Sequence, residues 1–208
     1  ERGNYRPNIP AEPPQKQGRA ASVDWPSPTL PYVVVAHHGP AYSDLRKDKA
    51  ALDFLVPIAF GENSDLYQRL VLKEQKVDML LTSFDDQIDP ELFAVVARVK
   101  DVKDLNYVRD AIVATFERYS EERVTQEKLD ETRSHIRYST ALSWTSAGAI
   151  AGFLAPYIAL NGTPRTVDRL FALYQQVTPK DIQETAKRFF TSDNRTIVTL
   201  ATKKEEAR

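Results

Sequence analysis

The sequence contains no cysteine, only 7 glycines and only 3 histidines among its 208 residues. The lack of Cys excludes disulfides, thiolate nucleophiles and thiolate metal ligands. Charges nearly cancel, with 28 Lys and Arg against 29 Asp and Glu, so bulk charge does not favour binding to nucleic acid. No apolar run approaches the roughly 18 residues that a transmembrane helix needs. The 42% of hydrophobic residues is instead typical of a globular chain.

Proline is concentrated at the start of the chain, where Pro7, Pro10, Pro13 and Pro14 occur within residues 1–18. Proline removes backbone donors and fixes φ, so this stretch is expected to be extended and outside the core. It is typical of a linker from a preceding domain, and a disordered terminus fits the composition equally well. Because the chain starts at Glu1 without Met, we expect a fragment with a linker (1–18), an α/β domain (19–202) and a charged tail (203–208).

β-Branched and apolar runs bounded by turn residues predict five strands. The predicted strands are 19–25, 31–38, 77–82, 92–100 and 196–202. The polar residues 84–90 between the third and fourth strands indicate an antiparallel pair.

Apolar residues at spacings of three and four predict helices, several with capping residues at their starts. The predicted helices are 43–60, 65–73, 102–121, 125–143, 146–161, 165–177 and 180–190. Pro57 is expected to kink the first helix or end it early. The strand and helix order predicts an α+β fold: a two-layer α/β sandwich with a mostly antiparallel sheet and helices packed on one face.

The three histidines do not form a recognisable metal site. His37 and His38 are adjacent at a predicted strand end, so their side chains point to opposite faces and cannot easily bind one ion. His135 follows Glu131 by one helical turn, which is typical of a solvated helix face. Neither H-E-x-x-H nor H-x-x-E-H occurs, and no G-x-S-x-G or phosphate-binding loop is present. No catalytic or metal-ligating residue is therefore assigned to this chain.

Two further features have alternative interpretations. Asp85, Asp86 and Asp89 can in principle bind Ca²⁺ through oxygen, but a polar hairpin turn is the favoured interpretation. Gly148 and Gly152 lie four residues apart in a predicted helix and cost it stability. Close packing against another helix is the favoured explanation for them, and contact with a partner domain is the alternative.

Several motifs occur in a characteristic order. They are Pro13-Pro14-Gln15 with Gly18-Arg19, the strand Tyr32–Ala36 followed by His38-Gly39-Pro40, residues Gly61–Leu70, residues Lys73–Val77, and Leu173-Tyr174 through Val177–Ile182 to Ala186. Together they resemble the C-terminal half of the insulinase/pitrilysin family of zinc metallopeptidases over residues 13–201.

The resemblance implies a function for the chain within a larger enzyme. Such peptidases consist of homologous α/β halves that enclose a chamber. The N-terminal half binds zinc through H-x-x-E-H and a distant Glu, and the C-terminal half supplies the opposing wall and helps bind extended peptide. This chain is then expected to be inactive alone and to hold no cofactor. Its expected partners are the preceding zinc-binding domain or a homologous subunit, a peptide substrate, and further copies of itself.

The resemblance also suggests substrate-binding residues. Relatives hold substrate through an Arg and a Tyr of the second half, and Arg98 and Tyr107 are the nearest candidates here. Their spacing does not match clearly, and Phe93 falls where relatives have the Arg. The alternative to substrate binding is that Arg98 is a solvated strand residue and that Tyr107 packs at the start of a helix.

Two other functions remain open. The parent protein can be a catalytically inactive homologue that acts as a scaffold or partner subunit, or the chain can be an unrelated α+β binding module. The resemblance and the absent Cys favour an exported or periplasmic bacterial protein over a cytoplasmic or mitochondrial one.

Overall fold

A single five-stranded sheet, in the order β1-β5-β2-β4-β3, organises this computed structural model, which describes residues 10–203. The strands are β1 (Arg19–Trp25), β2 (Tyr32–His38), β3 (Val77–Ser83), β4 (Leu92–Val99) and β5 (Arg195–Thr202). Neighbouring strands are antiparallel except β1 and β5, which are parallel. The last strand therefore lies between the first two and joins both ends of the domain. The predicted mostly antiparallel sheet is confirmed.

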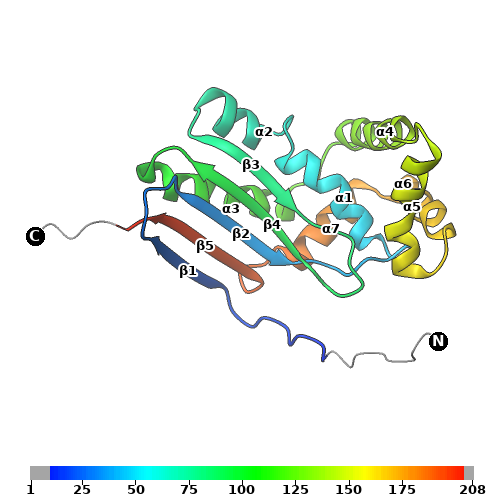
Figure 1. The fold of residues 1–208 in the computed structure, drawn as a ribbon, viewed down its shortest axis with the longest axis horizontal. Coiled ribbons are helices and arrows are strands. Elements are labelled where there is room, and N and C mark those ends of the chain that lie inside the picture. Colours follow the sequence, from blue (N-terminus) through cyan, green and yellow to red (C-terminus); the bar gives the residue numbers. More distant parts are fainter. Residues whose placement is uncertain (1–9, 204–208) are drawn as a thin grey trace, which may run out of the picture.

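The helices pack on one face of the sheet (Figure 1), so the predicted two-layer α+β sandwich is also confirmed. They are α1 (Lys47–Phe60), α2 (Asp65–Tyr67), η1 (Gln68–Lys73), η2 (Val102–Asp104), α3 (Leu105–Glu121), α4 (Gln126–Ser143), α5 (Ala147–Asn161), α6 (Arg165–Gln176) and α7 (Pro179–Phe189). Among the helices of residues 10–203, none combines the length and apolar character needed to cross a bilayer.

Helix starts follow the capping residues in the sequence. The hydroxyl of Thr125 accepts a hydrogen bond from the backbone N–H of Lys128, and that of Ser146 accepts one from Ala149. Thr178 and Asp181 form a reciprocal capping box at the start of α7. These side chains satisfy backbone donors that the helices themselves leave free, so the three helices begin where the sequence predicts.

The first helix begins later than predicted and ends at Phe60, as predicted. It begins at Lys47, because the hydroxyl of Ser43 accepts hydrogen bonds from Leu45 and Arg46 in a local turn. It continues through Pro57 to Phe60, so of the two expected effects of Pro57, a kink or an early end, the early end does not occur. The residues after Pro57 are buried in the core, and this burial offsets the hydrogen bond that proline removes.

The core lies between the helices and one face of the sheet. Val33 and Val35 of β2 and Phe93, Val95 and Ala97 of β4 point into it. The rings of Phe60, Phe93, Phe116 and Phe190 meet there, with centroids 4.7–5.8 Å apart. Burial of this aromatic cluster stabilises the contact of α1, α3 and α7 with the sheet.

Residues 10–18 form no helix or strand and run along the start of β5. The side-chain amide of Gln15 donates hydrogen bonds to the backbone oxygens of Asp193 and Arg195, at 2.9 and 3.1 Å. The rest of the predicted linker (1–9) and most of the predicted charged tail (204–208) lie outside the described residues. The linker and tail assignments therefore stay predictions.

Candidate functional site: the open face of the sheet

The face of the sheet that turns away from the helices is the most distinctive surface of the molecule. We call it the open face. Strand register places every second residue of each strand on it. Its apolar side chains are Ala21, Val23, Trp25, Tyr32, Val34, Ala36, Met79, Leu81, Leu92, Ala94, Val96, Val198 and Leu200.

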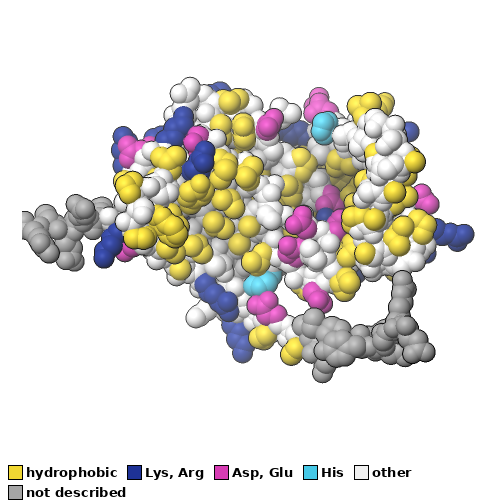
Figure 2. All heavy atoms as spheres, viewed as in Figure 1, with side chains coloured by type: hydrophobic (Ala, Val, Ile, Leu, Met, Phe, Trp, Pro, Cys, Tyr) yellow, Lys and Arg dark blue, Asp and Glu magenta, His cyan; other side chains and the backbone are white. Residues whose placement is uncertain are grey.

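Solvent-exposed side chains on the open face are largely hydrophobic, and Figure 2 shows them gathered over the strands. Trp25 is 47% exposed, Leu81 55% and Leu92 45%. An antiparallel sheet with helices on one side usually presents a polar second face to water. A continuous apolar patch of this kind marks a surface that meets a partner or ligand.

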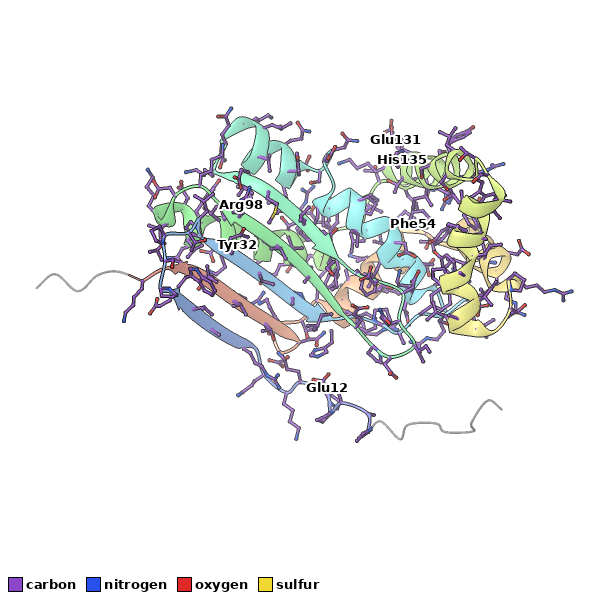
Figure 3. All side chains as sticks on the ribbon, viewed as in Figure 1. Glu12, Tyr32, Phe54, Arg98, Glu131 and His135 are labelled. Atoms are coloured by element: carbon purple, nitrogen blue, oxygen red, sulfur yellow. The ribbon has the colours of Figure 1, made fainter. Side chains whose placement is uncertain are left out.

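Charged groups border the open face at one end. The guanidinium of Arg98 on β4 donates two hydrogen bonds to the carboxylate of Asp78, at 2.8 and 3.0 Å. Tyr32 is the cross-strand neighbour of Arg98 on β2, and Figure 3 shows the two side chains close together. The hydrogen bonds from Arg98 lower the pKa of Asp78, so this pair stays ionised at neutral pH.

A second polar group lies at the opposite end of β2. The ring Nδ1 of His38 is 3.2 Å from the amide oxygen of Asn194, and its Nε2 is 3.6 Å from the carboxylate of Glu12. Asn194 also donates a hydrogen bond to the backbone oxygen of His38, at 2.9 Å. The open face is thus an apolar centre between two polar ends.

The structure does not bring the two predicted substrate-binding residues together. Arg98 is on the open face, whereas Tyr107 starts α3 in the helical layer. The Tyr107 hydroxyl donates a hydrogen bond to Glu74, at 2.9 Å, and its ring lies 5.4 Å from the ammonium of Lys76. Arg98 is therefore part of the open face, and Tyr107 is part of the helical layer. The substrate-binding role of either residue stays a prediction.

The histidines and acidic residues do not fit a zinc site. His37 is fully buried on the helical side, with its ring 4.5 Å from that of Phe116 and 5.3 Å from that of Phe190. His38 points to the open face, and His135 is exposed on α4 beside Glu131 (Figure 3). Across residues 10–203, no three His, Asp or Glu side chains are placed to hold a metal ion.

The acidic turn between β3 and β4 has a structural role. The carboxylate of Asp86 lies 2.8 Å from the ammonium of buried Lys49, which also pairs with Asp53 at 2.5 Å. Burial alone lowers the pKa of Lys49, but the two carboxylates raise it overall, so the ammonium stays charged. This pairing anchors the turn to α1, in agreement with the favoured interpretation of a polar turn.

The open face was missed as a functional surface in the sequence, although a signal for it is present. The strands YVVVAHH and LFAVVARV are apolar at nearly every position instead of every second one. In a sheet with helices on one face only, such a pattern places apolar side chains on the uncovered face as well.

Comparison with known proteins gives the family and the fold. Residues 3–136 match the family model described as the peptidase M16 inactive domain. No curated protein matches the sequence. Among solved structures, a protease from Helicobacter pylori is 22% identical, with a TM-score of 0.86. The alignment covers 96% of this chain and 48% of that one.

Two further similar solved structures are inactive peptidase domains. A peptidase M16 inactive domain from Pseudomonas fluorescens is 16% identical with a TM-score of 0.81, over 99% of this chain and 48% of that chain. The inactive peptidase domain of a zinc protease homologue from Bordetella parapertussis is 22% identical, with a TM-score of 0.72. That alignment covers 88% of this chain and 96% of the other. The chain thus spans about half the length of the first two structures and nearly all of the third.

Proposed function

The chain belongs to the family of the peptidase M16 inactive domain, and we propose that it serves as the non-catalytic C-terminal half of a zinc metallopeptidase. In this proposal the open face forms the chamber wall opposite the zinc site and helps to bind an extended peptide. The family match agrees with the resemblance of the sequence to the C-terminal half of insulinase/pitrilysin peptidases. The preceding zinc-binding half and the peptide substrate are part of the proposal.

The observation that carries the proposal is the apolar, uncovered second face of the sheet. Strands β2 and β4 place Val34 and Val96 at its centre, flanked by the exposed side chains of Leu81 and Leu92. An unfolded peptide offers apolar side chains and free backbone groups, and both can be satisfied by such a face and the strand edges beside it. At one end, the ion pair of Arg98 and Asp78 adds a polar group beside the apolar surface.

Zinc enters this proposal only through the companion half. The residues of this chain do not fit the metal, since His37 is enclosed by aromatic rings and His38 and His135 lie on separate surfaces. No catalytic step is therefore assigned to this chain. An inactive homologue with a scaffold role would use the same surface without hydrolysis.

Peptide binding to the open face can be measured with the chain's own tryptophans. The sequence has two, Trp25 on the open face and Trp144 beside α5, so Trp144→Phe leaves Trp25 as a single reporter. We expect an unstructured peptide to change the Trp25 emission in a saturable way. In this background, Leu81→Asp is expected to weaken binding by about fivefold, or about 1 kcal/mol, because it places a charge on the apolar surface.

The matched control is Leu72→Asp, because Leu72 is 53% exposed on η1, outside the open face. This variant is expected to bind the peptide as the parent does. Equal weakening by Leu72→Asp and Leu81→Asp, or no saturable change at Trp25, would contradict a peptide-binding role of the open face.

A further inference from the structure

Helix α5 lies within a segment that has no charged residue and little cover. Between Tyr138 and Pro164 the sequence contains no Asp, Glu, Lys, Arg or His. None of the residues of α5 is buried, and Ile150 and Ile158 are each 38% exposed. Leu142 and Tyr138, at the end of α4, are 76% and 68% exposed. A solvent-facing helix of this composition is unusual, because surface helices normally carry a charged outer side.

Only one side of α5 contacts the rest of the domain. The rings of Phe153 and Tyr157 lie on this side, with Phe153 5.4 Å from Trp144 and Tyr157 5.8 Å from Tyr42. On the other side, a Cβ added at Gly152 would meet no described atom within 4 Å. The favoured interpretation of the two glycines, close packing against another helix of this domain, is therefore wrong for the described residues. We call the side that carries the exposed residues Ala151, Gly152, Ala155 and Ile158 the outer side of α5.

We propose that the outer side of α5 is the docking surface for the half of the polypeptide that precedes this domain. The inference rests on the proposed function, because it takes the chain to be the second of two halves. It adds the place of contact: an uncharged helix surface, distinct from the open face, that holds the companion half beside the chamber. Interfaces that stay closed have few charged residues at their centre, as α5 does.

Two observations favour the preceding half as the occupant. First, the solved structures from Helicobacter pylori and Pseudomonas fluorescens are about twice as long as this chain, which covers 48% of each. Second, the described start of the chain, residues 10–18, runs from β1 toward the end of the molecule that carries α5 and α6 (Figure 1). This stretch contains Pro10, Pro13 and Pro14, which favour an extended path of about 3 Å per residue. In this proposal, the preceding half approaches the domain from the end that carries α5.

The absence of cysteine makes this contact directly testable by thiol labelling. Ala155→Cys and Ile158→Cys each introduce one thiol on the outer side of α5, and Leu72→Cys introduces a control thiol on η1. Each variant is labelled with a small maleimide in the isolated 208-residue chain and in the natural polypeptide that carries it. Mass spectrometry then reads the labelling rate at the substituted position, whatever other thiols the polypeptide contains.

We expect both α5 thiols to react at least about tenfold more slowly in the natural polypeptide than in the isolated chain, and the Leu72→Cys thiol to react equally in both. A tenfold difference corresponds to about 1.4 kcal/mol of docking free energy. Equal rates at the α5 thiols in the two forms would overturn the proposal. Protection in the isolated chain that rises with its concentration would also overturn it, because the occupant would then be a second copy.

A third labelling position separates this proposal from the peptide-binding function. Leu81→Cys on the open face is expected to react equally in both forms and to be protected only when an unstructured peptide is added. Protection of α5 without peptide protection at Leu81→Cys would support docking and contradict the proposed peptide site. Peptide protection at Leu81→Cys without protection of the α5 thiols would contradict docking and support the peptide site.

Discussion

At the scale of single residues, His37 is a fully buried polar side chain in an apolar environment. Both ring nitrogens are buried without a hydrogen-bond partner among the described residues, and the rings of Phe116 and Phe190 lie against it. Burial, with smaller contributions from the positive charges of Arg195 and His38, lowers the pKa of His37 from 6.5 to about 3. The folded protein therefore holds this histidine neutral at pH values where the unfolded chain protonates it.

His37 makes folding sensitive to acid. Between pH 6.5 and about pH 3 the unfolded state binds a proton that the folded state does not, so stability falls as the pH is lowered. The loss at pH 5 relative to pH 8 is about 2 kcal/mol from this residue. We expect His37→Leu to remove this part of the pH dependence in urea unfolding curves measured at the two pH values.

His135→Leu provides the matched control, because His135 is exposed on α4. Its unfolding free energy is expected to change between pH 8 and pH 5 as much as that of the parent. If His37→Leu showed the parent's full pH dependence, the neutral buried histidine would not be the cause of the acid sensitivity.

From the sequence, the side chains of His37 and His38 were expected to point to opposite faces of the sheet. The sequence did not show which of the two is buried. Strand alternation is local and readable, whereas the aromatic pocket around His37 is built from α3 and α7, far away in the sequence. Arg98 and Tyr107 show the same limit. Their places on a strand and at a helix start were predictable, whereas their hydrogen-bond partners, Asp78 and Glu74, were not.

At the scale of elements, glycines at two helix positions have opposite energetic roles. Gly61 follows α1 with ordinary extended backbone angles, but a Cβ there would lie 2.5 Å from the backbone oxygen of Pro57. Gly152 lies inside α5, where an added Cβ would meet nothing within 4 Å. The first glycine is required by close approach of the backbone, and the second only weakens its helix.

Alanine substitutions are therefore expected to have opposite signs in the isolated chain. Gly61→Ala should lower the unfolding free energy by about 1–3 kcal/mol, because the clash forces the end of α1 to shift. Gly152→Ala should raise it by up to about 1 kcal/mol, because alanine favours the helix. Chemical denaturation of the two variants beside the parent measures both effects. A destabilising Gly152→Ala would show that this side of α5 is covered even in the isolated chain.

Helix starts were the most predictable elements, since caps such as Thr125, Ser146 and Thr178 act within a few residues. The passage of α1 through Pro57 was not predictable from local rules. It depends on Phe60 and its neighbours being buried against β4 and α3, which only the tertiary structure provides. Tertiary burial here outweighs a local preference, as it often does.

At the scale of the whole molecule, one sheet covered on a single face explains both the fold and the candidate site. The predicted order of strands and helices along the chain was sufficient to give the two-layer sandwich. They also contained the open face, because β2 and β4 are apolar on both sides. The sequence could not show that the outer side of α5 is exposed. An apolar helix has the same sequence pattern whether or not a neighbouring element covers it.

The central claim is that this chain binds peptide but leaves hydrolysis to a companion half. The most direct measurement is cleavage of an unstructured peptide, in the presence of zinc, by the 208-residue chain alone and after addition of the separately expressed preceding region. We predict no cleavage by the chain alone, cleavage by the combination, and loss of that cleavage with a chelator. Chelator-sensitive cleavage by the chain alone would contradict the account, and a combination without any cleavage would favour an inactive homologue instead.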